Sequence, residues 1–189
     1  MSETTLSGYR VLAIVTGYGV EQDELVVPLD HLRDDGAEVV LAAASDDSIQ
    51  TLVGDKDQGK SVEPDTTIDA VDDKDYDLLL IPGGALNADH LRMDDDALGL
   101  IKAFASSGRP VAAICHAPWT LIEADVVDGK RLTSYASLQT DVRNAGGSWV
   151  DEEVVTDDTD GWTLVTSRTP DDLDAFLREV DTALQAQAR

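Results

Sequence analysis

The residues with the clearest chemistry are an adjacent cysteine and histidine, Cys115 and His116. The apolar run 111–114 predicts a short buried strand, and Pro118 opens a helical pattern. A sharp turn from strand to helix holds a side chain out of the sheet in a strained conformation. The helix N-terminus favours an anion, so we expect a lowered pKa for the Cys115 thiol. Such an arrangement is typical of nucleophilic catalysis, although many lone cysteines are inert and buried.

The length and the cysteine usage limit the class of protein. Cys115 is the only cysteine among 189 residues, which excludes an internal disulfide and fits a reducing, cytoplasmic environment. The length predicts one domain, residues 1–189, with a full hydrophobic core. Residues 1–8 have neither a positive n-region nor an apolar h-region, so we expect no secretory signal. No apolar run reaches the ~20 residues that a membrane span needs.

The charge of the chain is strongly acidic. The formal net charge is −24, from 14 basic and 38 acidic residues. A surface of this sign repels nucleic acid and anionic membranes, so we expect neither as a partner. Acidic residues are spread along the whole chain, which is typical of a halophilic protein whose charges are screened by high salt.

Continuous apolar strands alternate with helical patterns along the chain. Strands are predicted at 10–16, 38–43, 77–82, 111–114, 132–134, 154–155 and 162–166. Helices are predicted at 21–35, 97–107, 138–144 and 170–187, and Pro28 should lie in the first turn of its helix or kink it. Residues 45–75 are polar and predict short β elements or loops. The pattern indicates an α/β fold, a flavodoxin-like parallel sheet sandwiched by helices, with a cysteine nucleophile elbow.

A cysteine nucleophile needs a base, and the chain has three histidines. His116 adjoins the thiol, and at a sharp turn the two side chains can face each other. His90 follows the glycine turn and is the reserve base, whereas we expect His31, well inside the first helix, to be structural. No metal-ligand spacing joins these histidines to the cysteine, so no metal or other cofactor is expected.

The same edge of the sheet gathers the other groups that this chemistry needs, because sites form at the carboxyl ends of parallel strands. Three acids lie near it: Glu21, Glu24 and Asp89. Backbone N–H groups of Gly84 and His116 are the expected oxyanion site.

The chain resembles the PfpI-type intracellular proteases. The resemblance rests on AICHAPW at 113–119, IPGG at 81–84 and LTSY at 132–135. It extends to ELVVP at 24–28, NAGGSWVD at 144–151 and TSRTPDDL at 166–173, and so covers about residues 10–176. These proteases belong to the superfamily of the Parkinson's-disease-linked protein deglycase and the class I glutamine amidotransferase domains.

The resemblance implies roles for several residues. Cys115 matches the family nucleophile, and His116 matches its paired histidine. Glu24 matches a helix glutamate that hydrogen-bonds the cysteine, and it should be protonated part of the time because a carboxylate repels a thiolate. Asp89 matches an acid that completes the triad from a neighbouring subunit, with a one-residue insertion after Gly84. A homo-oligomer, either a dimer or a hexamer of dimers, is therefore implied.

Other positions bear on the oxyanion site and the substrate pocket. Gly83 and Gly84 form the turn beside the thiol, and Tyr135 matches a tyrosine near it, although a half-buried strand aromatic is an equal interpretation. Trp119 replaces a glutamine common in the family, and Ala117 replaces a glycine. A bulky indole near the site should change which substrates fit, unless Trp119 packs in the core.

Three functions follow from these residues. The first is a cysteine-dependent hydrolase, a peptidase or a deglycase, acting on peptides, glycated amines or α-oxoaldehydes. Glutaminase activity is disfavoured because no histidine follows His116. The second is a non-enzymatic redox sensor or stress chaperone that uses an oxidisable Cys115. The third is a structural protein with an inert thiol.

Overall fold

A computed structural model describes residues 5–187 of the chain. Residues 1–4, which belong to the segment tested for a secretory signal, lie outside the described residues. No helix in the described part is both long and apolar enough to span a membrane.

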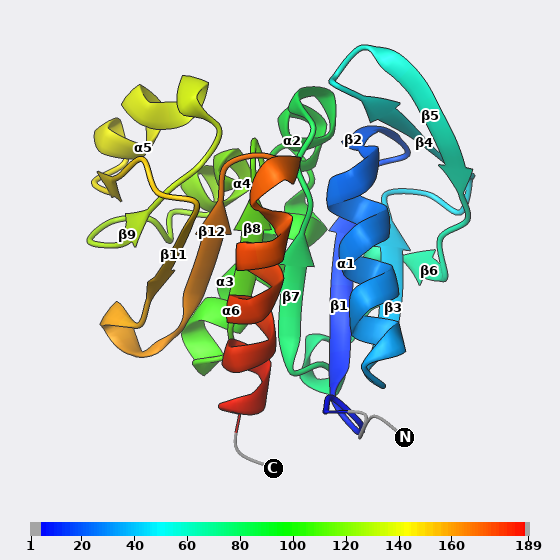
Figure 1. Cartoon of the computed structure of the whole chain (residues 1–189), viewed down its shortest axis with the longest axis horizontal. Helices are drawn as coiled ribbons and strands as arrows, with labels where there is room; N and C mark the ends of the chain where they lie inside the picture. Colours follow the sequence, from blue (N-terminus) through cyan, green and yellow to red (C-terminus); the bar gives the residue numbers. More distant parts are fainter. Residues whose placement is uncertain (1–4, 188–189) are drawn as a thin grey trace.

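A seven-stranded sheet forms the centre of the molecule (Figure 1). Its strand order is β11-β12-β8-β7-β1-β3-β6, and every neighbouring pair is parallel except β11 with β12. The order β3-β1-β7-β8-β12 is the flavodoxin-like order 2-1-3-4-5, which confirms the predicted fold class. Its strands are β1 (Arg10–Val15), β3 (Glu38–Ala43), β6 (Thr66–Thr67), β7 (Leu78–Ile81), β8 (Val111–Ile114), β11 (Val154–Asp157) and β12 (Leu164–Ser167).

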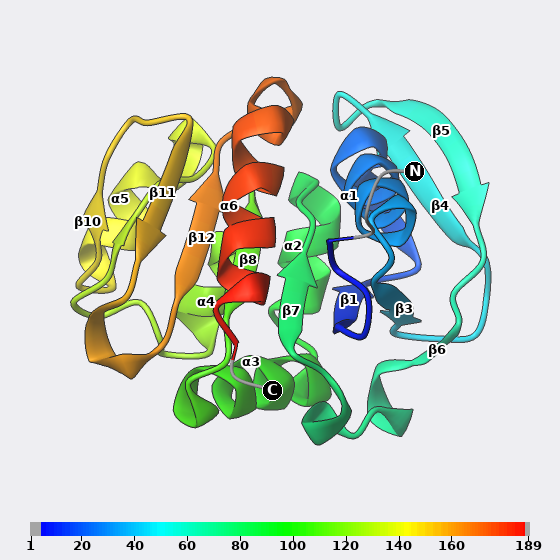
Figure 2. The same cartoon turned by 60° about the horizontal axis from the view of Figure 1, so that its bottom comes forward.

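Helices cover both faces of this sheet. Helices α1 (Gln22–Asp34) and α6 (Leu173–Gln185) lie side by side on one face, where Leu25, Phe176 and Val180 join the core around β1 (Figure 1). A second core on the other face includes residues of four helices (Figure 2). These are α2 (Ala85–Leu91), α3 (Asp95–Ser107), α4 (Pro118–Glu123) and α5 (Gln139–Asn144). Both cores explain why the strand sequences are continuously apolar.

Two small sheets flank the central one. The first joins β2 (Tyr18–Glu21), β4 (Ile49–Val53) and β5 (Asp57–Val62), and the second joins β9 (Arg131–Leu132) and β10 (Ser148–Trp149). The β4–β5 hairpin confirms that the polar segment 45–75 forms short β elements. The hairpin rises at the same end of the molecule as α2 and the start of α1 (Figure 1).

The structure corrects several predicted boundaries. Helix α3 begins before its predicted start because Asp94 caps it and accepts hydrogen bonds from two backbone N–H groups. Pro28 lies in the second turn of α1 rather than in the first, so the carbonyl of Glu24 lacks its usual N–H partner. The C-terminal helix is preceded by a separate 3₁₀ turn, Pro170–Asp172. Helix α2 and strand β2 were not predicted.

Candidate active site

Cys115 lies in the turn between β8 and α4, in a strained backbone conformation. Its φ is +64°, a left-handed value that costs a residue with a side chain about 1–3 kcal/mol. Two hydrogen bonds hold the turn: the Cys115 N–H donates to the Ser167 carbonyl at 3.0 Å, and its carbonyl accepts from the Tyr135 N–H at 2.8 Å. The predicted nucleophile elbow is present.

His116 faces the thiol directly. Its Nδ1 lies 3.3 Å from the Cys115 sulfur, a distance suited to proton transfer between them. The Tyr135 ring stacks on the imidazole with centroids 4.6 Å apart, and Trp119 contacts it at 5.3 Å. Cys115 is 5% exposed and His116 is 6% exposed, so both groups react in a largely desolvated place.

Glu24 reaches the same place from α1 and is fully buried. Its Oε2 accepts a hydrogen bond from the Gly83 N–H at 2.9 Å, whereas Oε1 is buried and has no hydrogen-bond partner among residues 5–187. Burial raises the pKa of Glu24 to about 8, against a smaller lowering by interaction with the Cys115 thiol. Glu24 is therefore mostly protonated at neutral pH and presents no negative charge to the sulfur.

The thiol itself is not an acidic one. Burial raises the pKa of Cys115, while a hydrogen bond from the Gly84 N–H lowers it. The prediction that the helix N-terminus gives a lowered thiol pKa is therefore wrong, because desolvation outweighs the N–H groups of this turn. Burial also lowers the pKa of His116, and the charge of Asp55 raises it.

The two glycines of the turn after β7 have different roles. A Cβ on Gly83 would lie 2.4 Å from the Glu24 Oε2 and 2.7 Å from the Cys115 Cβ. Gly84 has a φ of +87°, and a Cβ there would lie 2.2 Å from the Gly19 carbonyl. The Gly83 N–H is taken by Glu24, so the Gly84 N–H is the one that interacts with the thiol. The backbone N–H of His116 forms no backbone hydrogen bond within residues 5–187.

A pocket of about 300 Å³ opens over the sulfur. It is lined by Glu21, Glu24, Gly54, Asp55, Cys115, Tyr135, Thr169 and Pro170. Trp119 does not line it; its Nε1 donates to the Asp141 carboxylate at 2.9 Å, and it borders a separate hollow. The indole therefore contacts the back of the site through His116 rather than the pocket above the thiol.

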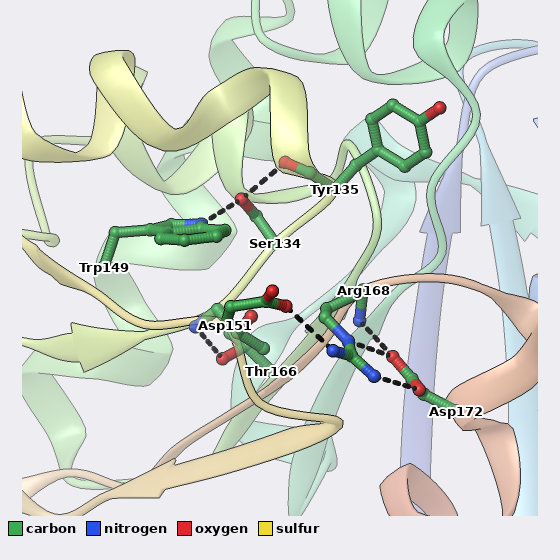
Figure 3. Close-up of polar contacts among 8 residues, drawn as sticks. Ser134, Tyr135, Trp149, Asp151, Thr166, Arg168 and Asp172 are labelled. Atoms are coloured by element: carbon green, nitrogen blue, oxygen red, sulfur yellow. Dashed lines mark hydrogen bonds and ion pairs between the residues drawn. The ribbon is translucent and has the colours of Figure 1, made fainter.

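Polar contacts hold the segment that gives Thr169 and Pro170 to the pocket lining, and Figure 3 shows these contacts. Arg168 donates to the Asp172 and Asp151 carboxylates, and these bonds hold the chain on either side of Thr169 and Pro170. Burial raises the pKa of Asp172, but the hydrogen bonds from Arg168 lower it, and the net pKa lies below the usual value. Thr169 and Pro170 of the TSRTPDDL motif thus form a wall of the pocket that is held by hydrogen bonds on both sides.

The segment that carries Tyr135 is held by a second set of contacts in the same view. Ser134 Oγ accepts from the Trp149 indole at 2.9 Å and donates to the Tyr135 carbonyl at 2.9 Å (Figure 3). Thr133 donates its N–H to Thr166 Oγ1. The Tyr135 side chain is 41% exposed, so it forms a wall of the pocket rather than part of the core.

The remaining predicted residues lie apart from the thiol. Asp89 and His90 are exposed on α2, and neither lines the pocket that contains Cys115 within the described residues. Within the described residues, the carboxylate beside His116 is that of Asp55, whose Oδ2 lies 4.0 Å from Nδ1. Sequence reasoning missed it because a Gly-Asp pair between strands reads as a turn.

Comparison with known proteins identifies the family of the chain. The sequence model of the DJ-1/PfpI family matches residues 9–183. The chain is 42% identical over 170 residues to protein/nucleic acid deglycase 2 of Escherichia coli, covering 90% of this chain and 95% of that protein. It has the same identity and coverage with general stress protein 18 of Bacillus subtilis.

A solved structure shows the same fold. The crystal structure of Drosophila melanogaster DJ-1beta superposes with a TM-score of 0.83 at 29% identity, covering 96% of this chain and 92% of that one. The family match spans nearly all of the described residues and includes the cysteine elbow, the glycine turn and the buried glutamate. The chain therefore belongs to the DJ-1/PfpI family.

Proposed function

We propose that the protein is a cysteine-dependent hydrolase of the deglycase type, acting on glycated amines and α-oxoaldehydes, with peptides as a second substrate class. The observation that carries the proposal is the 3.3 Å approach of the Cys115 sulfur to His116 Nδ1 beneath an open pocket. The deglycase name of the Escherichia coli relative supports the choice of substrate.

The chemistry needs one proton transfer before bond formation. The thiol proton moves from the sulfur to Nδ1 of His116, and the sulfur lone pair then forms a bond to the carbonyl carbon. The carbonyl electron pair moves to oxygen, where the N–H groups of Gly84 and His116 stabilise the charge. When the carbonyl re-forms in an amide-like substrate, the C–N bond breaks, the amine leaves with the proton of His116, and water releases the acyl group.

Glu24 makes this transfer feasible in a buried place. With its pKa raised to about 8 by burial, Glu24 stays neutral while the thiolate forms, so the two groups do not repel each other. The protonated carboxyl is also a donor for the developing charge on sulfur.

The net charge of −24 narrows the substrate class. A polynucleotide is repelled by such a surface, so proteins and small carbonyl compounds are the proposed substrates, although the name of one relative includes nucleic acid. The acidic surface also supports the proposal that the protein functions in a salt-rich cytoplasm, where salt screens its charges. Melting temperatures that are equal in ~0.1 M and ~2 M KCl would contradict this proposal.

Asp89 is proposed to act from a neighbouring copy in a homo-oligomer. It is exposed on α2, and His116 Nε2 has no hydrogen bond to another described residue, which leaves that nitrogen for an outside acid. Asp89→Asn should lower the rate only in the assembled oligomer.

The decisive experiment compares the wild type with Cys115→Ala on a glycated amine, methylglyoxal and a fluorogenic peptide. The substitution should lower turnover at least about a thousandfold, and activity that survives it removes Cys115 from the mechanism. If no substrate turns over and peroxide adds two oxygens to Cys115, a redox sensor is the better description.

A further inference from the structure

Asp55 occupies the tip of the β4–β5 hairpin and is fixed there by contacts on two sides. Gly54 and Asp55 have positive φ values of 64° and 56°, as in the tight turns that favour Gly and Asp. The Glu21 carboxylate accepts hydrogen bonds from the N–H groups of both residues at 3.1 and 3.2 Å. Asp55 Oδ1 accepts from the Ala85 N–H at 2.8 Å. One oxygen is thereby anchored beside the glycine turn.

The other oxygen faces the imidazole. Asp55 Oδ2 lies 4.0 Å from His116 Nδ1, too far for a hydrogen bond but close enough for a strong charge interaction in a partly buried place. The Asp55 side chain is 34% exposed and lines the same pocket as Cys115. The other titratable groups against the imidazole are the Cys115 thiol and the Tyr135 phenol.

The turn alone does not explain this carboxylate. A turn aspartate commonly accepts a hydrogen bond from a backbone N–H one or two residues further along the chain. The Asp55 carboxylate instead accepts from Ala85, thirty positions away. The contact ties the hairpin to the loop that supplies the Gly84 N–H, so Asp55 joins two parts of the site.

We propose that Asp55 is a positioning residue for the cysteine chemistry, which holds and stabilises the imidazolium form of His116 from within the same chain. This rests on the proposed function of Cys115. When the thiol proton arrives at Nδ1, the new N–H lies between the thiolate and Asp55 Oδ2, and no other bond changes. Asp55 balances the positive charge of the ring at Nδ1, the nitrogen that exchanges the proton. An acid from another copy of the chain would contact the other nitrogen, Nε2.

The test uses Asp55→Asn in the full-length protein. Asparagine tolerates a left-handed φ and retains an oxygen for the Ala85 N–H, so the turn and its anchor stay while the charge is lost. Asp57→Asn is the matched control, because Asp57 is exposed on the same hairpin and its substitution removes the same charge. The pKa of His116 is followed by NMR, with His31 and His90 as internal references.

In Asp55→Asn the pKa of His116 should fall by about one unit, and kcat on the glycated amine should fall about tenfold. The KM should change less than about twofold, and the acidic limb of kcat/KM, below which His116 is protonated and cannot accept the thiol proton, should move to lower pH by the same unit. Asp57→Asn should leave all of these values at their wild-type level.

An unchanged His116 titration in Asp55→Asn overturns the proposal, as does an equal shift in Asp57→Asn. A normal titration together with a rate loss in Asp89→Asn assigns the acid to the neighbouring copy. Failure of the proposed function is separate: it appears as a wild type without turnover, and the histidine titration still decides the role of Asp55.

Discussion

Two of the histidine–aspartate pairs among residues 5–187 have very different settings. His31 on α1 and Asp181 on α6 are in direct contact, with Nε2 2.9 Å from a carboxylate oxygen. His116 and Asp55 are 4.0 Å apart, and yet only this second pair has a thiol beside it. The closer pair links two helices across the surface, and the looser pair lies in the pocket over Cys115.

The difference shows that closeness of a pair does not identify a reactive site. His31 lies on a regular helix with its side chain 31% exposed, that of Asp181 is 22% exposed, and a histidine–carboxylate pair at the surface contributes about 0–1 kcal/mol. His116 is held by the strained turn at Cys115, where φ is +64°. The reactive pair is marked by backbone strain, by burial, and by a carboxylate that lies too far from the imidazole for a hydrogen bond. The structural pair is marked by direct contact between its two side chains.

The largest effect is expected when the packing around Cys115 and His116 is disturbed. Gly83→Ala places a Cβ 2.4 Å from the Glu24 Oε2, which must displace Glu24 or the elbow and so lower kcat/KM about a hundredfold or more. The His31–Asp181 pair should remain intact. The measurement is turnover of the glycated amine together with urea unfolding.

The matched control for this change is Gly99→Ala in α3, where a Cβ would meet nothing within 4 Å. It should retain full activity and gain up to ~1 kcal/mol in stability. Equal activity losses in the two variants would mean that any glycine-to-alanine substitution lowers activity, and that the close contacts of Gly83 with the site are not the cause.

An intermediate effect is expected from the ionisation of Glu24, measured as the change in the free energy of unfolding with pH. The pKa of Glu24 is raised from 4.5 to about 8, so the folded state binds more protons than the unfolded state across this interval. Stability should therefore fall by a few kcal/mol as pH rises from 4.5 to about 8, and level off above it. Glu24→Gln should remove this slope, as measured by urea unfolding at a series of pH values.

Glu153→Gln serves as the control, since Glu153 is exposed. It should leave the slope unchanged. A wild-type stability that rises through this interval would show that Glu24 is ionised in the folded protein, and the neutral-glutamate step of the mechanism would have to be abandoned.

The smallest effect is expected at the structural pair. His31→Gln or Asp181→Asn should lower stability by no more than about 1 kcal/mol and leave turnover unchanged. A double-mutant cycle measures the coupling, which should shrink in high salt. Asp35 lies close to both residues, so a rise in melting temperature on adding Zn²⁺ that is lost in both variants would instead indicate a metal site.

The sequence predicts the elements that carry the site well, and their chemistry less well. Continuous apolar runs identify the strands, because burial on both faces leaves no alternation, and Cys115 falls at the end of one of them. Helix α2 is missed because its seven residues carry too little periodicity. For Trp119 the sequence leaves substrate contact and core packing both open, since a helical position alone does not say which neighbour an indole meets; in the structure it packs, partly buried, against the core on the α3 and α4 face.

The contribution of Asp55 and the raised thiol pKa lie beyond sequence reasoning for a common physical cause. Both depend on contacts between segments far apart in the chain: Asp55 with Ala85, and Cys115 with Glu24. Desolvation depends on how completely such segments close over a group. A residue's type and spacing do not report that closure.

The edges of the central sheet affect how copies of the chain can meet. Strand β6 has only two residues, and β11 has four, of which the last is Asp157; it follows Glu152-Glu153 and precedes Asp158. Short and charge-flanked edges resist the addition of strands from another molecule. They guard the folded protein against edge-to-edge aggregation, and association of copies is left to the helix and loop surfaces.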